Sequence, residues 1–240
     1  MTPPIGVIAD STAVLFGGIV GSLFGAKIPE QIRSALPDVF SLAAFCLAIS
    51  GIIKMNSPAV VVLALLTGFV IGKLLNLERL IHRWGKWTAA RIAGAAVEQS
   101  GLQPEQFSEK FTVAVILFCA GSLNVYGAVV SAVSGDHSIL IAKSVLDFFT
   151  AVIFATTIGY SVAFLSVVQF GLMLLFYIVA APLSSWITPQ MFQDFSCCGG
   201  LILFSTAFRM AGIKSYSSAN MLPALVVVMP LSFLWGLLGI

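Results

Sequence analysis

Charge is scarce in this 240-residue sequence: only 9% of the residues are Asp, Glu, Lys or Arg, whereas 59% are hydrophobic. Charged residues normally make up about a quarter of a soluble protein. A globular core of this length could not bury so much apolar surface, because surface area limits what one core can hide. The composition therefore excludes a soluble fold for most of the chain and indicates a protein that is solvated by a lipid bilayer.

The alternating pattern of a membrane β-barrel is also missing. Backbone polar groups in hydrocarbon must be paired within the protein, so only helices and closed barrels span a bilayer. Barrel strands alternate apolar and polar residues, but here the apolar runs are continuous, as over residues 113–133. The sequence predicts an all-α, polytopic bundle of about eight transmembrane helices. The expected spans are residues 5–24, 38–54, 58–75, 111–133, 139–159, 161–181, 197–209 and 221–238.

Signatures of several function classes are absent as well. The sequence has no G-x-S-x-G, no phosphate-binding loop and no dinucleotide-binding fingerprint. Its only histidines, His82 and His137, lie outside the expected spans, and its four cysteines match no zinc or redox spacing. No basic tract suggests a nucleic-acid partner. We therefore expect neither an enzyme nor a resident metal or cofactor.

Basic residues gather in alternate loops. Most of the 12 Lys and Arg residues follow the first, third and seventh expected spans. Cytoplasmic loops are enriched in Lys and Arg, so the basic loop 73–110 is expected in the cytoplasm and both termini outside.

That loop combines apolar residues at helical spacing with basic residues between them. The apolar set is Leu74, Leu77, Leu80, Ile81, Trp84 and Trp87. We interpret it as an amphipathic helix on the inner membrane surface, in contact with anionic lipid. A site for a cytoplasmic partner is the alternative. Residues 101–109 are expected to form a polar connector.

Short sequence blocks recur along the chain. Gly21-Ser22-Leu23 returns as Gly121-Ser122-Leu123, in segments that are expected to run in opposite directions. One interpretation is an inverted repeat with three, three and two helices, which is typical of secondary transporters. The other interpretation is that apolar sequences match one another by chance. The repeat divides the chain into a first transmembrane repeat (1–75), a cytoplasmic amphipathic linker (76–110), a second repeat (111–181) and a C-terminal transmembrane pair (182–240).

Ionisable residues inside a membrane are costly, and each is a functional candidate. Lys143 and Asp147 are four apart in the fifth expected span, so they share a helix face. They could form a substrate- or ion-binding carboxylate gated by its lysine, or a structural ion pair. Asp10, near the outer end of the first span, could bind a cation. We favour a second role for Asp10, the N-cap of a helix that starts at Ser11.

Polar and small residues in other spans are further candidates. Asn124 and Gln169 are mid-span amides, which bind either a solute or a neighbouring helix. Gly199 and Gly200 open the seventh span and either allow close packing or mark a broken helix that coordinates a ligand. Asn220 opens the last span. The first span carries a ridge of glycines four apart, which permits close packing within the chain or in a homodimer: Gly17, Gly21 and Gly25.

Four sequence blocks, residues 116–123, 143–147, 199–202 and 220–225, resemble the YqgA/YdfK-like family of bacterial membrane proteins, whose function is unknown. The resemblance covers nearly the whole chain. It implies a protein of the bacterial cytoplasmic membrane, often described as a transporter, and implies no substrate.

Two positions depart from the family pattern. The family favours Asn where this chain has Asp10, and it tends to carry Gly-x-Asn where this chain has Ala207-Phe208-Arg209. A compensating Asp10–Arg209 pair is one interpretation, although the expected topology puts the two residues at opposite faces of the membrane. The departures put in doubt any transfer of a polar site to these positions.

The first functional hypothesis is a secondary transporter of an amino acid, an amine or a carboxylate, coupled to H⁺ or Na⁺. Its solute site would use Asp147, Lys143, Asn124, Gly199, Gly200 and Asn220. Asp147 and Asp10 would be the ion ligands. The alternatives are a passive channel, and a non-transporting scaffold or sensor that acts through the loop 73–110. The expected partners are a small solute, membrane lipid and a second copy of the chain.

Overall fold

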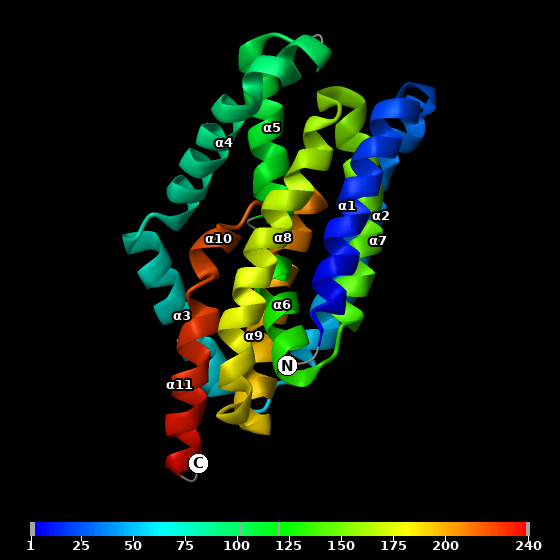
Figure 1. Cartoon of the computed structure of the whole chain (residues 1–240). Helices are drawn as coiled ribbons and strands as arrows, with labels where there is room; N and C mark the ends of the chain where they lie inside the picture. Colours follow the sequence, from blue (N-terminus) through cyan, green and yellow to red (C-terminus); the bar gives the residue numbers. More distant parts are fainter. Residues whose placement is uncertain (1–2, 101, 120, 239–240) are drawn as a thin grey trace. The chain divides into compact units, whose positions relative to one another are not determined.

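The structure is a computed structural model that describes residues 3–100, 102–119 and 121–238 (Figure 1). Throughout these residues the secondary structure is helical, which confirms the all-α class. The 3₁₀ turns are Gly25–Lys27 and Ala181–Ser185. The α-helices are α1 (Ile5–Phe24), α2 (Glu30–Ile52), α3 (Pro58–Leu74), α4 (Leu77–Ser100), α5 (Pro104–Cys119), α6 (Ser122–Ser134), α7 (Ser138–Ile158), α8 (Ser161–Ala180), α9 (Pro189–Met210), α10 (Ser218–Met221) and α11 (Ala224–Leu237).

Six helical stretches in the described part are long and apolar enough to cross a membrane. They are Ile5–Phe24, Pro104–Ser134, Ser138–Ile158, Ser161–Trp186, Pro189–Met210 and Ser218–Leu237. A seventh is added if the bent pair Pro58–Leu74 and Leu77–Thr88 counts as one span. The expected second span corresponds to a shorter apolar helix, Asp38–Ile52. By length and composition the structure thus supports six or seven of the about eight expected spans. Within the described residues no internal repeat is shown, and the inverted repeat stays a prediction.

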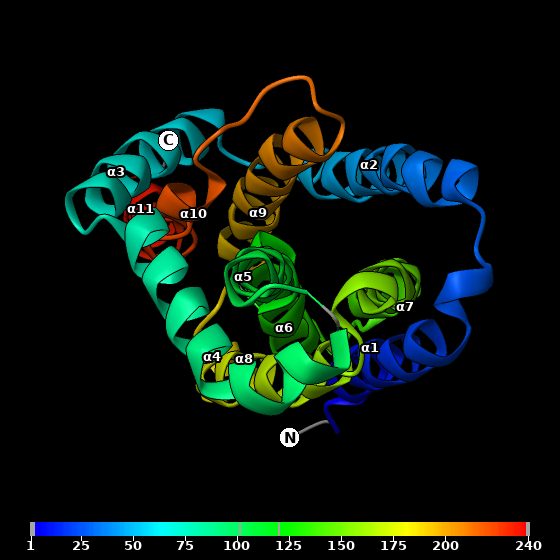
Figure 2. The same ribbon diagram turned by 90° about the horizontal axis from the view of Figure 1, so that it is seen from above.

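The chain forms two compact units. The first contains Met1–Ser34 and Arg79–Ala181, and the second contains Ala35–Glu78 and Pro182–Ile240. In the first unit α1 lies against α7 and α8 (Figure 2). Gly6 faces Leu140 and Gly21 faces Val152, so α1 and α7 run parallel.

The glycine ridge of α1 explains how closely α1 approaches α7. A Cβ atom added at Gly17 would meet the carbonyl oxygen of Phe148, and one at Gly21 would meet that of Val152. Only glycine leaves room for the neighbouring backbone at these positions. The ridge therefore packs inside the first unit. Beside it lies an apolar core built from α1, α5, α7 and α8, which includes Val14, Phe107, Phe111, Phe118, Ala151 and Leu165.

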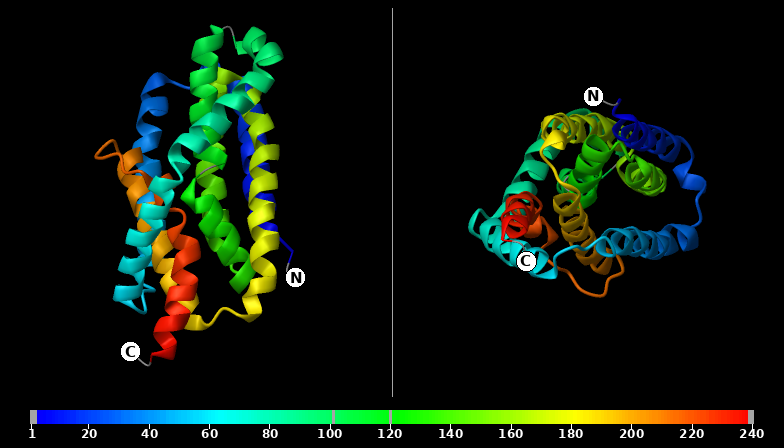
Figure 3. Two further views of the ribbon diagram at one scale, coloured as in Figure 1. Left: turned by 90° about the vertical axis from the view of Figure 1, so that its left-hand side faces the viewer. Right: turned by 90° about the horizontal axis from the view of Figure 1, so that it is seen from below.

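In the second unit, α11 packs against α3 and α9 (Figure 3). Small residues again allow close contact. Gly68 of α3 faces Ala224, and Gly72 faces the carbonyl oxygen of Asn220. The same unit contains an aromatic cluster of Phe45, Phe204, Phe208 and Tyr216, whose rings meet edge to face.

Two helix starts differ from the sequence-based expectation. The seventh span was expected to begin at residue 197, but α9 begins at Pro189, where the Thr188 hydroxyl accepts a hydrogen bond from the Met191 N–H at 3.3 Å. Thr as N-cap followed by Pro is a strong helix start. The expected polar connector 101–109 is mostly helical, because α5 already begins at Pro104. Residue 101 lies outside the described residues.

Candidate functional site

Four polar side chains from three helices meet in the interior of the first unit. Asp10 comes from α1, Lys143 and Asp147 come from α7, and Gln169 comes from α8. The four-residue spacing puts Lys143 and Asp147 on one face of α7. Because glycines let α1 approach that face closely, the carboxylate of Asp10 reaches the lysine. We call this set the charged cluster.

The bonds of the charged cluster form a closed ring. Lys143 Nζ donates to Asp10 Oδ2 at 2.8 Å and also to Asp147 Oδ2. Gln169 Nε2 donates to the same two atoms, at 2.5 Å to Asp10 Oδ2 and at 3.0 Å to Asp147 Oδ2. Two donors therefore converge on one oxygen of each carboxylate.

The cluster is buried, and the formal charges of its side chains do not balance. The exposed fraction of the side chain is 0% for Asp10, 5% for Lys143 and 14% for Asp147. Two ionised carboxylates and one ammonium leave one net negative charge. A charge in hydrocarbon is costly unless it is paired, so the cluster is chemically suited to take up one positive charge.

The expected N-cap role of Asp10 is wrong. Helix α1 begins at Ile5, where the Ile8 N–H already donates to the carbonyl of Pro4, so Asp10 lies well inside the helix. Its side chain bonds Lys143 and Gln169 instead. Arg209, the suggested partner of Asp10, lies in the last turn of α9 in the second unit.

Asn124 marks a break in the fourth expected span. Helix α5 ends at Cys119 and α6 begins at Ser122. Asn124 Nδ2 donates to the Phe118 carbonyl at 2.5 Å, across that break, while its buried Oδ1 has no hydrogen-bond partner among the described residues. The amide therefore satisfies a carbonyl at the end of α5, and it makes no bond to the charged cluster in this part of the chain.

The remaining predicted site residues belong to the second unit. Helix α9 runs unbroken through Gly199 and Gly200, so the broken-helix interpretation is wrong. A Cβ atom at Gly200 would lie 2.6 Å from the carbonyl oxygen of Ala48, which makes close packing its role. Asn220 Nδ2 donates to Glu78 Oε2, and Asn220 Oδ1 accepts from the Glu78 N–H, both at 3.3 Å.

Sequence reasoning missed Asp194, a fully buried carboxylate in α9. Its Oδ1 accepts from the backbone N–H groups of Asn56 (3.2 Å) and Ser57 (2.7 Å), and its Oδ2 accepts from the Ser232 hydroxyl at 2.7 Å. The first two bonds satisfy backbone amides of the connection that leads into α3. The Thr188-Pro189 helix start was the signal that would have put this acid inside a helix.

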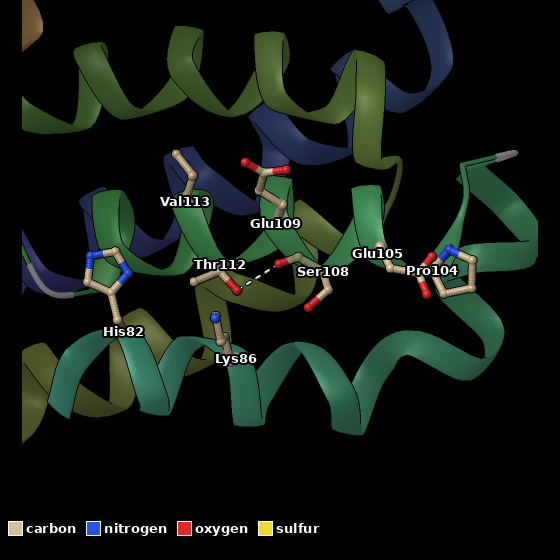
Figure 4. Close-up of a pocket in the computed structure, with 8 residues that line it drawn as sticks. All are labelled: His82, Lys86, Pro104, Glu105, Ser108, Glu109, Thr112 and Val113. Atoms are coloured by element: carbon tan, nitrogen blue, oxygen red, sulfur yellow. Dashed lines mark hydrogen bonds between the residues drawn. The ribbon is translucent and has the colours of Figure 1, made fainter. Parts of the chain in front are cut away.

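A pocket of about 730 Å³ lies between α4 and α5 in the first unit (Figure 4). Its wall on α4 carries His82 and Lys86, and its wall on α5 carries Glu105 and Glu109. Thr112, which donates to the Ser108 carbonyl at 2.7 Å, lines it as well (Figure 4). The pocket brings both signs of charge to the segment that was expected to be an amphipathic linker.

Comparison with known proteins places the chain among bacterial membrane proteins. It is 39% identical over 233 residues to the uncharacterized protein YqgA of Escherichia coli (strain K12), covering 96% of this chain and 97% of YqgA. It is 26% identical over 230 residues to the uncharacterized membrane protein YdfK of Bacillus subtilis (strain 168), covering 92% and 93%. No solved structure matches the chain. The model of a family described as a protein of unknown function, DUF554, matches residues 5–233, so this multi-pass membrane protein belongs to the DUF554 family.

Proposed function

We propose that the protein is a secondary transporter of a small polar or charged solute, coupled to H⁺ or Na⁺, in the bacterial cytoplasmic membrane. The observation that carries this proposal is the charged cluster, which buries two carboxylates and one ammonium within membrane-spanning helices. Ionisable residues in such positions commonly mark ion and substrate pathways. The net negative charge favours uptake of a cation, and the sequence has no nucleotide-binding motif that could drive transport instead.

Within the cluster, Asp147 is the residue assigned to the solute, and Asp147 and Asp10 are the candidate ligands of the coupling ion. Its side chain keeps 14% exposure, whereas the Asp10 side chain keeps none. Asp147 can therefore meet a solute from outside the ring, with Lys143 beside it to balance a carboxylate-bearing substrate. The solute is expected to be an amino acid, an amine or a carboxylate.

The proposal includes an orientation. The basic loop 73–110 faces the cytoplasm and both termini face outward, as the distribution of Lys and Arg favours. The parallel course of α1 and α7 is compatible with it, because both helices would run from the outer to the inner surface. The proposal also includes an inverted repeat. Its halves are the segments 1–75 and 111–181, the segment 76–110 is the linker between them, and the segment 182–240 is an added pair of helices.

A thermal-shift screen of the detergent-purified protein tests the solute site. The probes are amino acids, polyamines, carboxylates and Na⁺, each added to the wild type and to Asp147→Asn. A ligand that binds the folded state raises the melting temperature by mass action. We expect one solute class to raise the Tm of the wild type and to leave that of Asp147→Asn unchanged. An equal shift in both proteins would contradict the assignment of Asp147.

The pocket between α4 and α5 favours a second candidate function, a scaffold or sensor that acts through the loop 73–110. Its opposed His82–Lys86 and Glu105–Glu109 walls could hold a partner that carries both charges. Under this function Lys86→Ala would remove the cellular phenotype of the protein and Asp147→Asn would preserve it. The transporter proposal predicts the reverse.

A further inference from the structure

Two buried oxygen atoms in the charged cluster have no hydrogen-bond partner among the described residues: Asp10 Oδ1 and Gln169 Oε1. They belong to two groups that already touch, because Gln169 Nε2 donates to Asp10 Oδ2 at 2.5 Å. A buried acceptor left without a donor is destabilising, and more so if it is charged. The contact between this carboxyl and this amide is therefore half complete.

A single proton would complete the contact between the Asp10 carboxyl and the Gln169 amide. We propose that Asp10 carries a proton on Oδ1 and donates it to Gln169 Oε1, which makes Asp10 the coupling-proton carrier of the transport cycle. A carboxylic acid and a primary amide each have one donor and one acceptor to offer on facing edges. With the amide N–H on Asp10 Oδ2 and the acid O–H on Gln169 Oε1, both unpartnered oxygens gain a bond. The proton comes from a hydronium ion in the adjoining water: one of its O–H bonds breaks, the new O–H bond on Asp10 Oδ1 forms, and a water molecule leaves.

Charge leads to the same conclusion. Along α1, α6, α7 and α8 the sequence has three acidic or basic residues, namely Asp10, Lys143 and Asp147. The thiol of Cys119 in α5 also interacts electrostatically with Lys143 and Asp147, but it brings no positive charge. One proton brings the cluster from one net negative charge to neutrality, which removes the penalty for an unpaired charge in hydrocarbon.

The proton is assigned to Asp10 because Asp10 is the more enclosed carboxyl. Its side chain has no exposure, whereas Asp147 keeps 14% and can still be solvated in its ionised form. A Na⁺ ion suits the position less well. The Lys143 ammonium lies 2.8 Å from Asp10 Oδ2 and would repel a second cation there, while a proton enters a covalent O–H bond.

This inference rests on the proposed transport function, since it names the coupling ion. Infrared spectroscopy of the purified protein tests it without a transport assay. The C=O stretching band of a protonated carboxyl is separate in frequency from the bands of carboxylates, and its frequency shifts in D₂O. In neutral choline buffer we expect this band in the wild type, its loss in Asp10→Asn, and its retention in Asp136→Asn, a matched control in the exposed turn before α7.

Two further variants keep the test decisive if Asp10→Asn fails to fold. Lys143→Met makes the cluster more negative and should keep the band. Gln169→Leu removes the acceptor for the acid O–H and should shift the frequency of the C=O band. The proposal is overturned if the difference spectrum between the wild type and Asp10→Asn lacks the band, if Gln169→Leu leaves it unmoved, or if Na⁺ abolishes it.

The outcomes also separate this inference from the transport function. Coupled uptake by a protein that lacks the band would overturn the proton site and leave the transporter standing. The band in a protein that takes up none of the probe solutes would support a buried acid–amide pair and count against transport.

Discussion

Lys143 and Asp10 are 133 positions apart in the sequence, yet Lys143 Nζ lies 2.8 Å from Asp10 Oδ2. The pair joins α7 to α1 inside the first unit, where Gly17 and Gly21 let the two helices come into backbone contact. Asp147 then binds the same ammonium from the next turn of α7. The packing of small residues thus creates the buried charged cluster on which the transport proposal depends.

Lys143→Met should lower thermal stability. Removing one member of a buried ion pair leaves an uncompensated charge, at a cost of up to about 3–5 kcal/mol. We expect a lower Tm in detergent for this variant and partial recovery when Asp147→Asn is added, since that change removes the carboxylate that has lost its counter-charge. Lys54→Met, at an exposed turn, is the control and should leave the Tm unchanged. A Tm equal to that of the wild type in Lys143→Met would mean that the ion pair does not hold α1 to α7.

Gly21→Ala should destabilise the first unit. The added methyl group would strike the backbone carbonyl of Val152, which cannot rotate away, and overpacking of this kind costs about 1–3 kcal/mol. Gly171→Ala in α8 is the matched control, because nothing lies within 4 Å of the added Cβ atom. Helix propensity favours that second change by up to about 1 kcal/mol. Comparison of the two melting temperatures checks the prediction, and equal values would contradict the close α1–α7 contact.

Asp194→Ala should destabilise the second unit more than Ser232→Ala does. The first change leaves the part-buried backbone N–H groups of Asn56 and Ser57, just before α3, without their acceptor. A hydrogen bond to a charged group contributes about 1.5–3 kcal/mol. The second removes only the hydroxyl bond to Asp194 Oδ2. Hydrogen exchange at the amides of Asn56 and Ser57 measures the effect locally. Protection unchanged in Asp194→Ala would show that the carboxylate does not bind these two amides.

Asn76→Val should strain the turn between α3 and α4, whereas Asn76→Gly should be tolerated. Asn76 has a φ of 52°, a left-handed conformation that Asn and Gly adopt at low cost. A β-branched side chain pays about 1–3 kcal/mol in this region. The expected order of melting temperatures is Gly at or above Asn, and both above Val. A Val variant as stable as the wild type would contradict the left-handed turn.

Features that depend on local sequence could be predicted, and those that depend on packing could not. The i,i+4 relation of Lys143 and Asp147 follows from helix geometry, and long apolar runs are sufficient to locate most spans. The bond from Lys143 to Asp10 depends on which helix packs beside α7, which a pattern along one chain does not encode. Asp10 was misinterpreted as a cap because Asp favours that position, although the apolar residues before it extend α1 back to Ile5.

The helix breaks were harder to locate than the helices. Gly199 and Gly200 are a conspicuous pair of flexible residues, but α9 continues through them, because Gly200 is needed for its close contact with Ala48. The break lies instead between α5 and α6, where Gly121 is extended and Asn124 bonds back to Phe118. Glycine content alone does not distinguish a packing contact from a break, since both uses require a missing side chain.

Gradient-driven uptake into proteoliposomes decides whether the charged cluster couples an ion to a solute. Labelled amino acids, polyamines and carboxylates are supplied under an imposed H⁺ gradient, an imposed Na⁺ gradient or none, to the wild type and to Asp147→Asn. We predict that one solute class accumulates in the wild type under one of the gradients, and that Asp147→Asn folds normally but falls to the level of empty liposomes. Undiminished coupled uptake by Asp147→Asn, or an ohmic current that needs no gradient coupling, would contradict the transporter proposal.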